Sequence, residues 1–259
     1  MKVVEVGNIK IGGNNPLAFI LGPCIIENDT YEQAKELKKI MDKFNQPFIF
    51  KCSWDKANRT GYDGYRGFGI DKGIEILMKI KKDFNLPVLT DFHIPEQAEK
   101  LGKYFDVLQV PAYLTRQTDM LFAAGKYAKV VNIKKAQFMN PLDMKKVISK
   151  IEYVNNKNIL VTERGTCFGY DDLVVDFRSF VIMKKFGYPV IFDATHSIKI
   201  ENPELDQKEF IEPLAKAAIA IGVDGLFMEV HPDCSRALCD GKWMLPFERL
   251  EKFMEVIKK

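Results

Sequence analysis

Ionisable and metal-binding side chains recur directly after short apolar runs in this sequence. Lys51 ends the run PFIFK, Lys134 ends the run KVVNIK, and Asp91 closes the run LPVLTD. All three histidines of the chain stand just after such runs, whereas a protein without a site would scatter them. Side chains of this kind, held together, bind anions, coordinate metal ions and move protons. The pattern therefore predicts a chemical site built from the ends of several buried segments.

Six cations in these positions predict a strongly anionic ligand. They are Lys51, Lys56, Arg59, Arg116, Lys134 and Arg164. Like charges gathered in one place need anions to hold them together, and phosphate and carboxylate groups supply them. For any single cation a solvated surface position is the usual alternative, but that alternative is weaker for Lys51 and Lys134, which directly extend apolar runs. Lys135 should point to the face opposite Lys134 and serve the structure instead.

A separate set of residues offers ligands for a metal ion. It consists of Cys24, His196, Glu229 and Asp240. One thiolate, one imidazole and two carboxylates suit a divalent transition ion such as Fe²⁺, Zn²⁺ or Mn²⁺. The chain has no short CxxC or HExxH signature, so from the residues alone Cys24 is more often a small buried hydrophobe than a ligand. His231 is either a further ligand or a neighbour of the ligands.

The elements that must position these residues alternate along the chain. Eight apolar runs end at residues 22, 51, 91, 110, 134, 163, 194 and 229, and their unbroken apolar character is typical of parallel strands buried on both faces. Apolar residues at helical spacing predict helices over 31–44, 73–84, 95–102, 117–127, 142–153, 173–186, 208–221 and 247–257. Eight strands, each followed by a helix, predict an α/β protein with a single domain over residues 1–259, a (β/α)8 TIM barrel.

The N-terminal residues predict one further element, a β-hairpin. It turns at Gly7–Asn8 and is expected to close the bottom of the barrel. An open doubly wound sheet is the competing architecture, but no G-x-G-x-x-G follows an early strand. In a TIM barrel the chemistry lies at the C-terminal ends of the strands, which is where the ionisable side chains fall.

Composition excludes several classes of protein. The chain has 259 residues, 47% of them hydrophobic, and a net charge of +3, which argues against disorder and against a nucleic-acid surface. It has no uncharged apolar run of about 18 residues, so we expect no membrane span. The N-terminus lacks the apolar segment of a secretion signal, and the five cysteines are an odd number. We therefore expect a cytoplasmic protein with reduced thiols.

Long motifs along the whole chain carry a resemblance to a known family. They are LGPCIIEN, FKCSWDKANR, TDFHIPEQA, LQVPAYLTRQTD, VNIKKAQFMNP, TERGTCFGYDDLVVDFRS, FDATHS and GLFMEVHPD. In these motifs the sequence resembles the 3-deoxy-D-manno-octulosonate 8-phosphate (Kdo8P) synthases. The related aromatic-pathway DAHP synthases share the barrel and the chemistry, but they carry a KPRTS-type motif where this chain has KANR. That difference favours the Kdo8P side of the resemblance.

The resemblance implies a transferase that condenses phosphoenolpyruvate with D-arabinose 5-phosphate and water, giving Kdo8P and phosphate for lipopolysaccharide or capsule sugars. Motif matching implies that phosphoenolpyruvate is held by Lys51, Lys56, Gln109, Arg116, Lys134 and Arg164. It implies that the aldose phosphate is held by Asn58, Arg59 and Thr60, with Lys56 between the two substrates. The residues expected to act in catalysis are Lys56, Asp91, His93, Lys134 and His196.

The resemblance also implies a metal and an assembly. Members of the family divide into metal-dependent enzymes, with Cys at the end of the first barrel strand, and metal-independent enzymes, with Asn there. Cys24 places this chain with the first group, and His196, Glu229 and Asp240 match the remaining ligands of a divalent Fe, Zn or Mn ion. Family members are tetramers, so a homotetramer is expected.

Two departures from the family pattern fall on the aldose side. After KANR the family has serines where this chain has Gly61 and Gly64, and Asp63 adds a negative charge. The segment after Ser197 is shorter than the family lid and lacks its glycines. A different acceptor sugar is therefore an alternative. Two further alternatives are a metal-dependent aldolase and a non-catalytic phosphosugar-binding barrel, and obligate phosphate release from phosphoenolpyruvate would separate both from the synthases.

Overall fold

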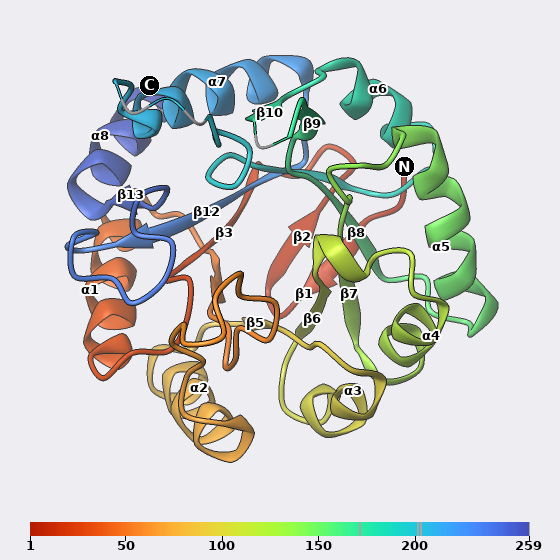
Figure 1. The fold of residues 1–259 in the computed structure, drawn as a ribbon, viewed down its shortest axis with the longest axis horizontal. Helices are drawn as coiled ribbons and strands as arrows, with labels where there is room; N and C mark the ends of the chain where they lie inside the picture. The colour runs from red at the N-terminus through yellow and green to blue at the C-terminus, as the bar shows by residue number, and fades with distance from the viewer. Residues whose placement is uncertain (171, 201, 203, 259) are drawn as a thin grey trace.

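Eight parallel strands form a closed ring in the computed structural model, which describes residues 1–170, 172–200, 202 and 204–258. In order around the ring they are β3 (Ala18–Gly22), β4 (Ile49–Lys51), β5 (Val88–Asp91), β6 (Val107–Val110), β7 (Val130–Lys134), β8 (Ile159–Glu163), β11 (Val190–Asp193) and β12 (Gly225–His231). Strand β12 pairs in parallel with both β11 and β3, and this pairing closes the ring (Figure 1). The predicted TIM barrel is confirmed.

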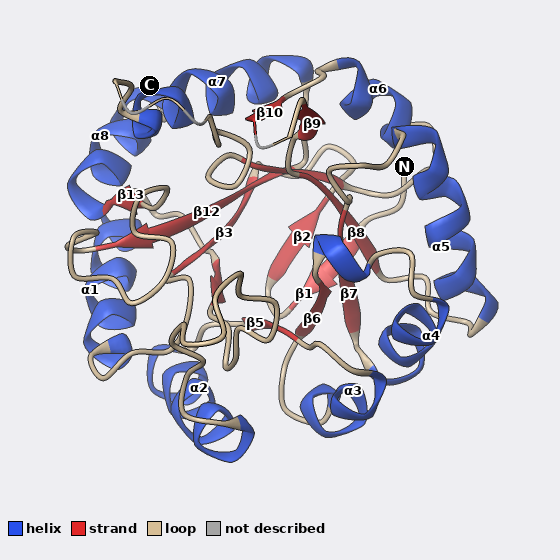
Figure 2. Cartoon of the chain, in the orientation of Figure 1, coloured by secondary structure: helices blue, strands red, loops and turns tan. Residues whose placement is uncertain are grey.

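Helices surround the ring on its outside (Figure 2). They are α1 (Thr30–Lys43), α2 (Ile70–Phe84), α3 (Pro95–Gly102), α4 (Thr118–Tyr127), α5 (Met144–Tyr153), α6 (Arg178–Lys184), α7 (Ile211–Ile221) and α8 (Phe247–Ile257), with short 3-10 turns η1 (Ala112–Leu114), η2 (Pro141–Asp143) and η3 (Gln207–Phe210). Each helix turns an apolar stripe toward the strands, as in α1, where Ala34, Leu37 and Met41 are fully buried. None of the described helices is long and apolar enough to cross a membrane.

The N-terminal hairpin forms as predicted. It consists of β1 (Val4–Val6) and β2 (Ile9–Ile11), paired antiparallel with Val6 opposite Ile9. Gly7 has φ +58° in the turn, a conformation that glycine adopts without a steric penalty. The hairpin is seen through the ring in Figure 2, and its apolar side chains form one cluster with the barrel interior. It therefore closes the bottom of the barrel.

The prediction of a helix over residues 173–186 was wrong over residues 173–177 and two residues too long at its end. Thr166–Phe168 (β9) and Asp172–Val174 (β10) form an antiparallel hairpin instead, and α6 begins only at Arg178. The cause is tertiary, because the Leu173 amide donates to the Lys199 carbonyl at 2.8 Å. The Asp176 carboxylate accepts the Arg178 amide at 3.0 Å, which provides a start for the helix. A two-residue strand, β13 (Leu245–Pro246), was also not expected.

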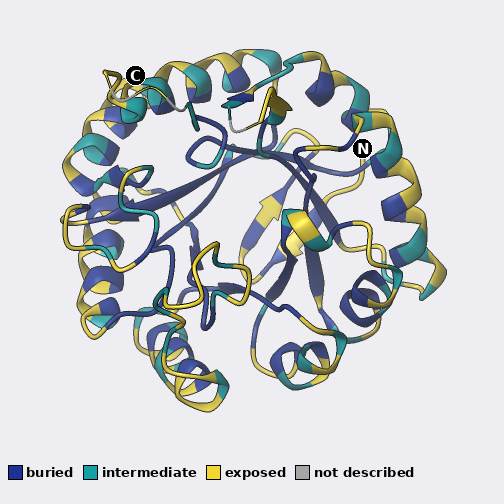
Figure 3. Cartoon of the chain, viewed as in Figure 1, coloured by how far each residue is buried: buried dark blue, intermediate teal, exposed yellow. Residues whose placement is uncertain are grey.

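The barrel strands are buried along their length (Figure 3). Because successive side chains of a strand point to opposite faces, these buried residues fall into two sets. One set points outward and packs with the helices. The inward set nearest the hairpin, called here the lower layer, is Ala18, Ile20, Ile49, Leu89, Val107, Val130, Leu160, Ile191 and Phe227. The same alternation, continued toward the C-terminal ends, gives the upper layer of Lys51, Asp91, Gln109, Asn132, Lys134, Thr162, Asp193 and Glu229. The lower layer is apolar and the upper layer is polar.

Candidate active site

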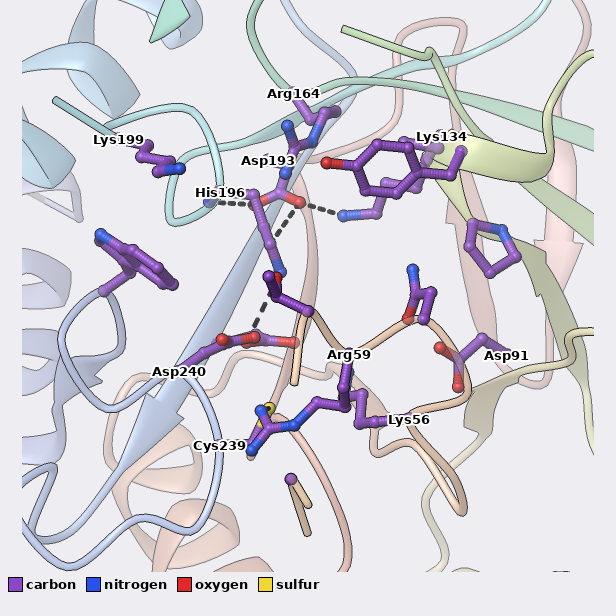
Figure 4. A pocket seen from close by; sticks show the side chains of 18 of the residues that line it. Lys56, Arg59, Asp91, Lys134, Arg164, Asp193, His196, Lys199, Cys239 and Asp240 are labelled. Carbon is purple, nitrogen blue, oxygen red and sulfur yellow. Dashed lines mark hydrogen bonds and ion pairs between the residues drawn. The ribbon is translucent and has the colours of Figure 1, made fainter. Parts of the chain in front are cut away.

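A cavity of about 480 Å³ opens above the upper layer. Most of the sequence-predicted site residues line it, namely Lys51, Lys56, Asn58, Arg59, Thr60, Asp91, Gln109, Lys134, Arg164, His196, Glu229 and Asp240. Figure 4 shows the labelled side chains converging on one space from strands and loops far apart in the sequence. A cavity of this size and cationic lining accommodates small phosphorylated molecules.

Three predicted residues do not line the cavity. Cys24 is buried directly beneath it, with its Sγ atom 3.2 Å from Asp240 Oδ2. His93 is also buried, with Nε2 3.6 Å from Asp91 Oδ2. Arg116 is exposed and lies outside the cavity lining, so the structure brings Cys24 and His93 to the site but not Arg116.

Asp91 and His93 carry unused hydrogen-bonding capacity. Among the described residues, neither ring nitrogen of His93 has a hydrogen-bond partner and Asp91 Oδ1 has none either, although these atoms are buried. Burial alone would raise the pKa of Asp91, but His93, Lys56 and Lys51 together hold it below its usual value. Buried polar atoms without partners are costly, so Asp91, which lines the cavity, is suited to receiving a polar group of a substrate.

Lys134 ends β7 and forms a buried ion pair with Asp193 at the end of β11. Burial lowers the pKa of Lys134 to about 8, although the Asp193 carboxylate acts in the opposite direction. Burial alone would raise the pKa of Asp193, but His196 and Lys134 hold it well below its usual range. Asp193 also lies 2.8 Å from His196 Nδ1, as the dashed lines in Figure 4 mark. The carboxylate therefore orients both a lysine and an imidazole toward the cavity.

Lys51 and Glu229 form a second buried pair. The Lys51 ammonium also donates to the Cys24 carbonyl at 2.9 Å. A β-carbon at Gly22 would lie 2.0 Å from the Lys51 carbonyl oxygen, so only glycine allows β3 and β4 to approach this closely. Burial alone would raise the pKa of Glu229, but Lys51 and His196 hold it well below its usual value. Glu229 is therefore a carboxylate at neutral pH.

The segment from Lys56 to Arg66 is a loop over the cavity. It is anchored by the Arg66 guanidinium, which contacts both oxygens of Asp55 at 2.5 and 2.6 Å. Burial alone would lower the pKa of Lys56, but the neighbouring Cys24 and Glu229 raise it well above its usual value. Gly61, Asp63 and Gly64, the departures from the family pattern, line the cavity together with Arg59.

The predicted metal ligands are brought together. Ligand atoms of His196, Glu229 and Asp240 lie within 4.8 Å of one another, and so do those of Cys24, Cys239 and Asp240. His196 Nε2 points toward Glu229 Oε2 at 3.7 Å, while its other ring nitrogen faces Asp193. An imidazole held by a carboxylate on one nitrogen is the usual arrangement of a metal-binding histidine. The donor set therefore fits a divalent transition ion.

Sequence reasoning missed Cys239 and left Asp193 out of the expected site. Asp193 carried a signal, since it ends an apolar run as Asp91 does. Cys239 carried none, because neighbouring residues usually point apart. Here Asp240 has φ +52°, and both Cys239 and Asp240 line the cavity.

His231 lies away from the ligand atoms. Its Nε2 is 3.2 Å from Glu27 Oε2, and the other oxygen of Glu27 accepts the Leu238 amide at 2.8 Å. His231 therefore helps to position the loop that carries Asp240, which answers the question that the sequence left open. The shortened segment after Ser197 lies partly outside the described residues, at 201 and 203. Its described part includes Lys199, which lines the cavity.

Comparison with known proteins agrees with this geometry. The model of the DAHP synthetase I family matches residues 1–259. Three similar proteins are each named 2-dehydro-3-deoxyphosphooctonate aldolase. The protein of Citrifermentans bemidjiense is 50% identical over 99% of this chain and 95% of its own. That of Geotalea uraniireducens is 48% identical over 100% and 97%, and that of Trichlorobacter lovleyi is 47% identical over 98% and 96%. The chain belongs to the DAHP synthetase I family.

Proposed function

We propose that this protein condenses phosphoenolpyruvate with D-arabinose 5-phosphate and water, giving Kdo8P and inorganic phosphate, as a metal-dependent Kdo8P synthase. The observation that carries the proposal is the meeting of buried and half-buried cations with a metal donor set in one cavity. The name shared by the relatives, which refers to a phosphorylated deoxy-octonate, supports the eight-carbon product.

The charges of the cavity match the two substrates. Two phosphates and one carboxylate must be neutralised, and Lys56, Lys134 and Arg164 all line the space. We assign phosphoenolpyruvate to these three residues together with Lys51 and Gln109. All of them line the cavity, and all but Lys56, which lies in the loop after β4, are grouped at strand ends. The aldose phosphate is assigned to the loop residues Asn58, Arg59 and Thr60. Lys56 then lies between the two substrates, where it offsets charge on both.

In the reaction, C3 of phosphoenolpyruvate attacks the aldehyde carbon, water adds at C2, and the phosphate leaves by C–O cleavage. A divalent ion held by Cys24, His196, Glu229 and Asp240 supplies Lewis-acid polarisation of the acceptor. Lys134, whose pKa is about 8, is able to exchange a proton near neutral pH and also holds an anionic oxygen. Asp193 keeps His196 and Lys134 in place. Asp91, which lines the cavity, receives a substrate hydroxyl or a proton, and His93 behind it offsets its charge.

We further propose a homotetramer in the cytoplasm, serving lipopolysaccharide or capsule sugar synthesis. Exposed apolar side chains at Phe138, Leu142 and Val174 surround a second hollow beside the β9–β10 hairpin. Apolar patches of this kind are typical of contacts between subunits. Sedimentation of the purified protein would test the tetramer, and a monomer at micromolar concentration would contradict it.

The decisive experiment measures phosphate release from phosphoenolpyruvate in the presence of arabinose 5-phosphate, before and after chelation. Release should stop with the chelator and return on addition of Fe²⁺, Zn²⁺ or Mn²⁺. Cys24→Ala should lose the response to metal. Cys234→Ala should keep it, because the Sγ of this nearby thiol donates to the backbone carbonyls of His231 and Met244. Absence of phosphate release with any acceptor would contradict the proposed chemistry, and release after complete metal removal would contradict the metal dependence.

A second candidate is the same chemistry with a different acceptor sugar. The observation that favours it is local, since Gly61 and Gly64 stand where hydroxyls are expected on the aldose side and Asp63 adds a negative charge. An acceptor panel of four- and five-carbon aldose phosphates would decide between the two. Best turnover with arabinose 5-phosphate would contradict this second candidate and leave the first in place.

A further inference from the structure

Cys239 is a buried thiol beside the metal donors. It has no role in the proposed reaction. Only 3% of it is exposed, and its Sγ atom lies 2.8 Å from Cys24 Sγ. Two sulfurs bound to one ion, each at about 2.3 Å, lie at most about 4.6 Å apart. The sulfur pair is therefore close enough to share an ion, and Asp240 completes this donor group within 4.8 Å.

An arginine from the loop over the cavity contacts the Cys239 sulfur. Arg59 Nη1 donates to Cys239 Sγ at 2.9 Å, and Nη2 of the same guanidinium donates to the Leu238 carbonyl at 3.2 Å. The guanidinium is cationic, so it would offset part of the negative charge of a sulfur bound to a metal ion. A β-carbon at Gly64 would lie 2.6 Å from Arg59 Nε. Glycine at this position therefore leaves the room in which Arg59 reaches the sulfur.

We propose that Cys239 is a second thiolate ligand of the divalent ion, beside Cys24. The inference rests on the proposed metal dependence and extends it. On binding, each of the two thiols gives its proton to solvent, and two metal–sulfur bonds form without any change of oxidation state. Thiolates are soft ligands, so a second one favours Zn²⁺ over Mn²⁺, which prefers oxygen donors. Arg59 then joins the metal centre to the loop assigned to the aldose phosphate.

The first test counts the sulfur ligands in the full-length wild-type protein. X-ray absorption of the Zn²⁺-loaded protein should show two sulfur atoms at about 2.3 Å from the ion. One sulfur atom would overturn the proposal. This measurement requires no substitution, so it decides the question even if a cysteine variant fails to fold.

The second test assigns each sulfur to its residue. Thiolate-to-Co²⁺ charge-transfer absorption of the Co²⁺-loaded protein should fall by about half in Cys239→Ser and by about half in Cys24→Ser, since each thiolate contributes to the band. Cys234→Ser is the matched control, because this thiol lies in the same loop region and contacts the carbonyls of His231 and Met244 instead. Full intensity in Cys239→Ser at equal Co²⁺ content would overturn the proposal.

The third test concerns metal preference. The ratio of Mn²⁺ to Zn²⁺ dissociation constants should fall by at least about tenfold in Cys239→Ser, since the lost ligand is one that Mn²⁺ scarcely uses. An unchanged ratio would overturn the proposal. Phosphate release, measured separately on the wild-type protein, distinguishes this failure from a failure of the proposed function: one sulfur with active phosphate release rejects only the role of Cys239.

Discussion

The lower and upper layers of the barrel interior are built from the same strands but differ in chemistry. Phe227 and Glu229 both belong to β12, and Ile191 and Asp193 both belong to β11, two residues apart in each case. The lower residue of each pair packs with the N-terminal hairpin, while the upper residue pairs with a lysine. Because alternate residues share a face, a step of two along a strand moves from core to active site.

The contrast between the apolar lower layer and the polar upper layer explains how the barrel tolerates so many buried charges. The upper layer carries two lysine–carboxylate pairs that are nearly free of solvent contact, Lys51–Glu229 and Lys134–Asp193. A buried ion pair contributes little net stability, because the desolvation cost offsets the attraction. The lower layer and the outward-facing cluster therefore supply stability, and the upper layer is organised for ligands.

The largest effect is expected from Lys134→Met. Loss of the cation should lower the turnover number by about 10²–10³-fold. It should also lower the free energy of unfolding by about 3 kcal/mol, because the buried Asp193 carboxylate loses the lysine that offsets its charge. Phosphate release and urea unfolding measure the two effects. The double variant Lys134→Met with Asp193→Asn should recover stability but not turnover. Turnover within tenfold of wild type in Lys134→Met would contradict the assigned role.

Ile191→Ala in the lower layer is expected to have a large effect on stability but none on substrate binding. Ile191 is fully buried, so the cavity should lower the free energy of unfolding by about 2–5 kcal/mol. The KM for phosphoenolpyruvate, measured at a temperature where the variant is folded, should remain as in wild type. A marked rise in this KM would show that the two layers are not independent.

The affinity for phosphoenolpyruvate should depend on pH through Lys134 of the upper layer. The pKa of Lys134 is lowered to about 8 by burial, so the side chain is charged below that pH and becomes neutral above it. Affinity for phosphoenolpyruvate should therefore fall as the pH rises above 8, by up to about tenfold per pH unit. Lys134→Arg, which stays protonated, should flatten this profile. An identical fall in Lys134→Arg would assign the titration to another group.

The lowered pKa of Lys134 also predicts how the free energy of unfolding depends on pH. Between pH 8 and the ordinary lysine value of 10.5, the unfolded chain holds a proton at Lys134 that the folded chain has lost. Because stability rises with pH wherever the unfolded state binds more protons, this residue should increase the free energy of unfolding across that interval. Denaturation of Lys134→Arg should lack this contribution.

The smallest effect is expected from Ile11→Val in the hairpin. The side chain is fully buried at the bottom of the barrel, and loss of one methylene should cost about 0.5–1.5 kcal/mol. Turnover and both KM values should be unchanged, since the hairpin lies at the end opposite the cavity. A change in metal affinity in this variant would contradict the separation of the layers.

Most of the fold was determined by local features of the sequence. Apolar runs such as those ending at Lys51 and Lys134 become strands because their period and length suit burial on both faces. The charged residues at the ends of those runs mark the edge of the barrel where the active site lies, because parallel strands all end at one edge. These features depend on neighbours along the chain, so they can be read from the order of residues alone.

Other features of the site were decided only by the tertiary structure. Cys239 lies 215 positions from Cys24, and their sulfurs meet because β12 pairs with β3 and because the backbone turns at Asp240. Arg116 lies outside the cavity. The β9–β10 hairpin replaces the start of a predicted helix because the Leu173 amide donates to the Lys199 carbonyl. Contacts between remote loops depend on ring closure and on long-range hydrogen bonds, and no local periodicity encodes them.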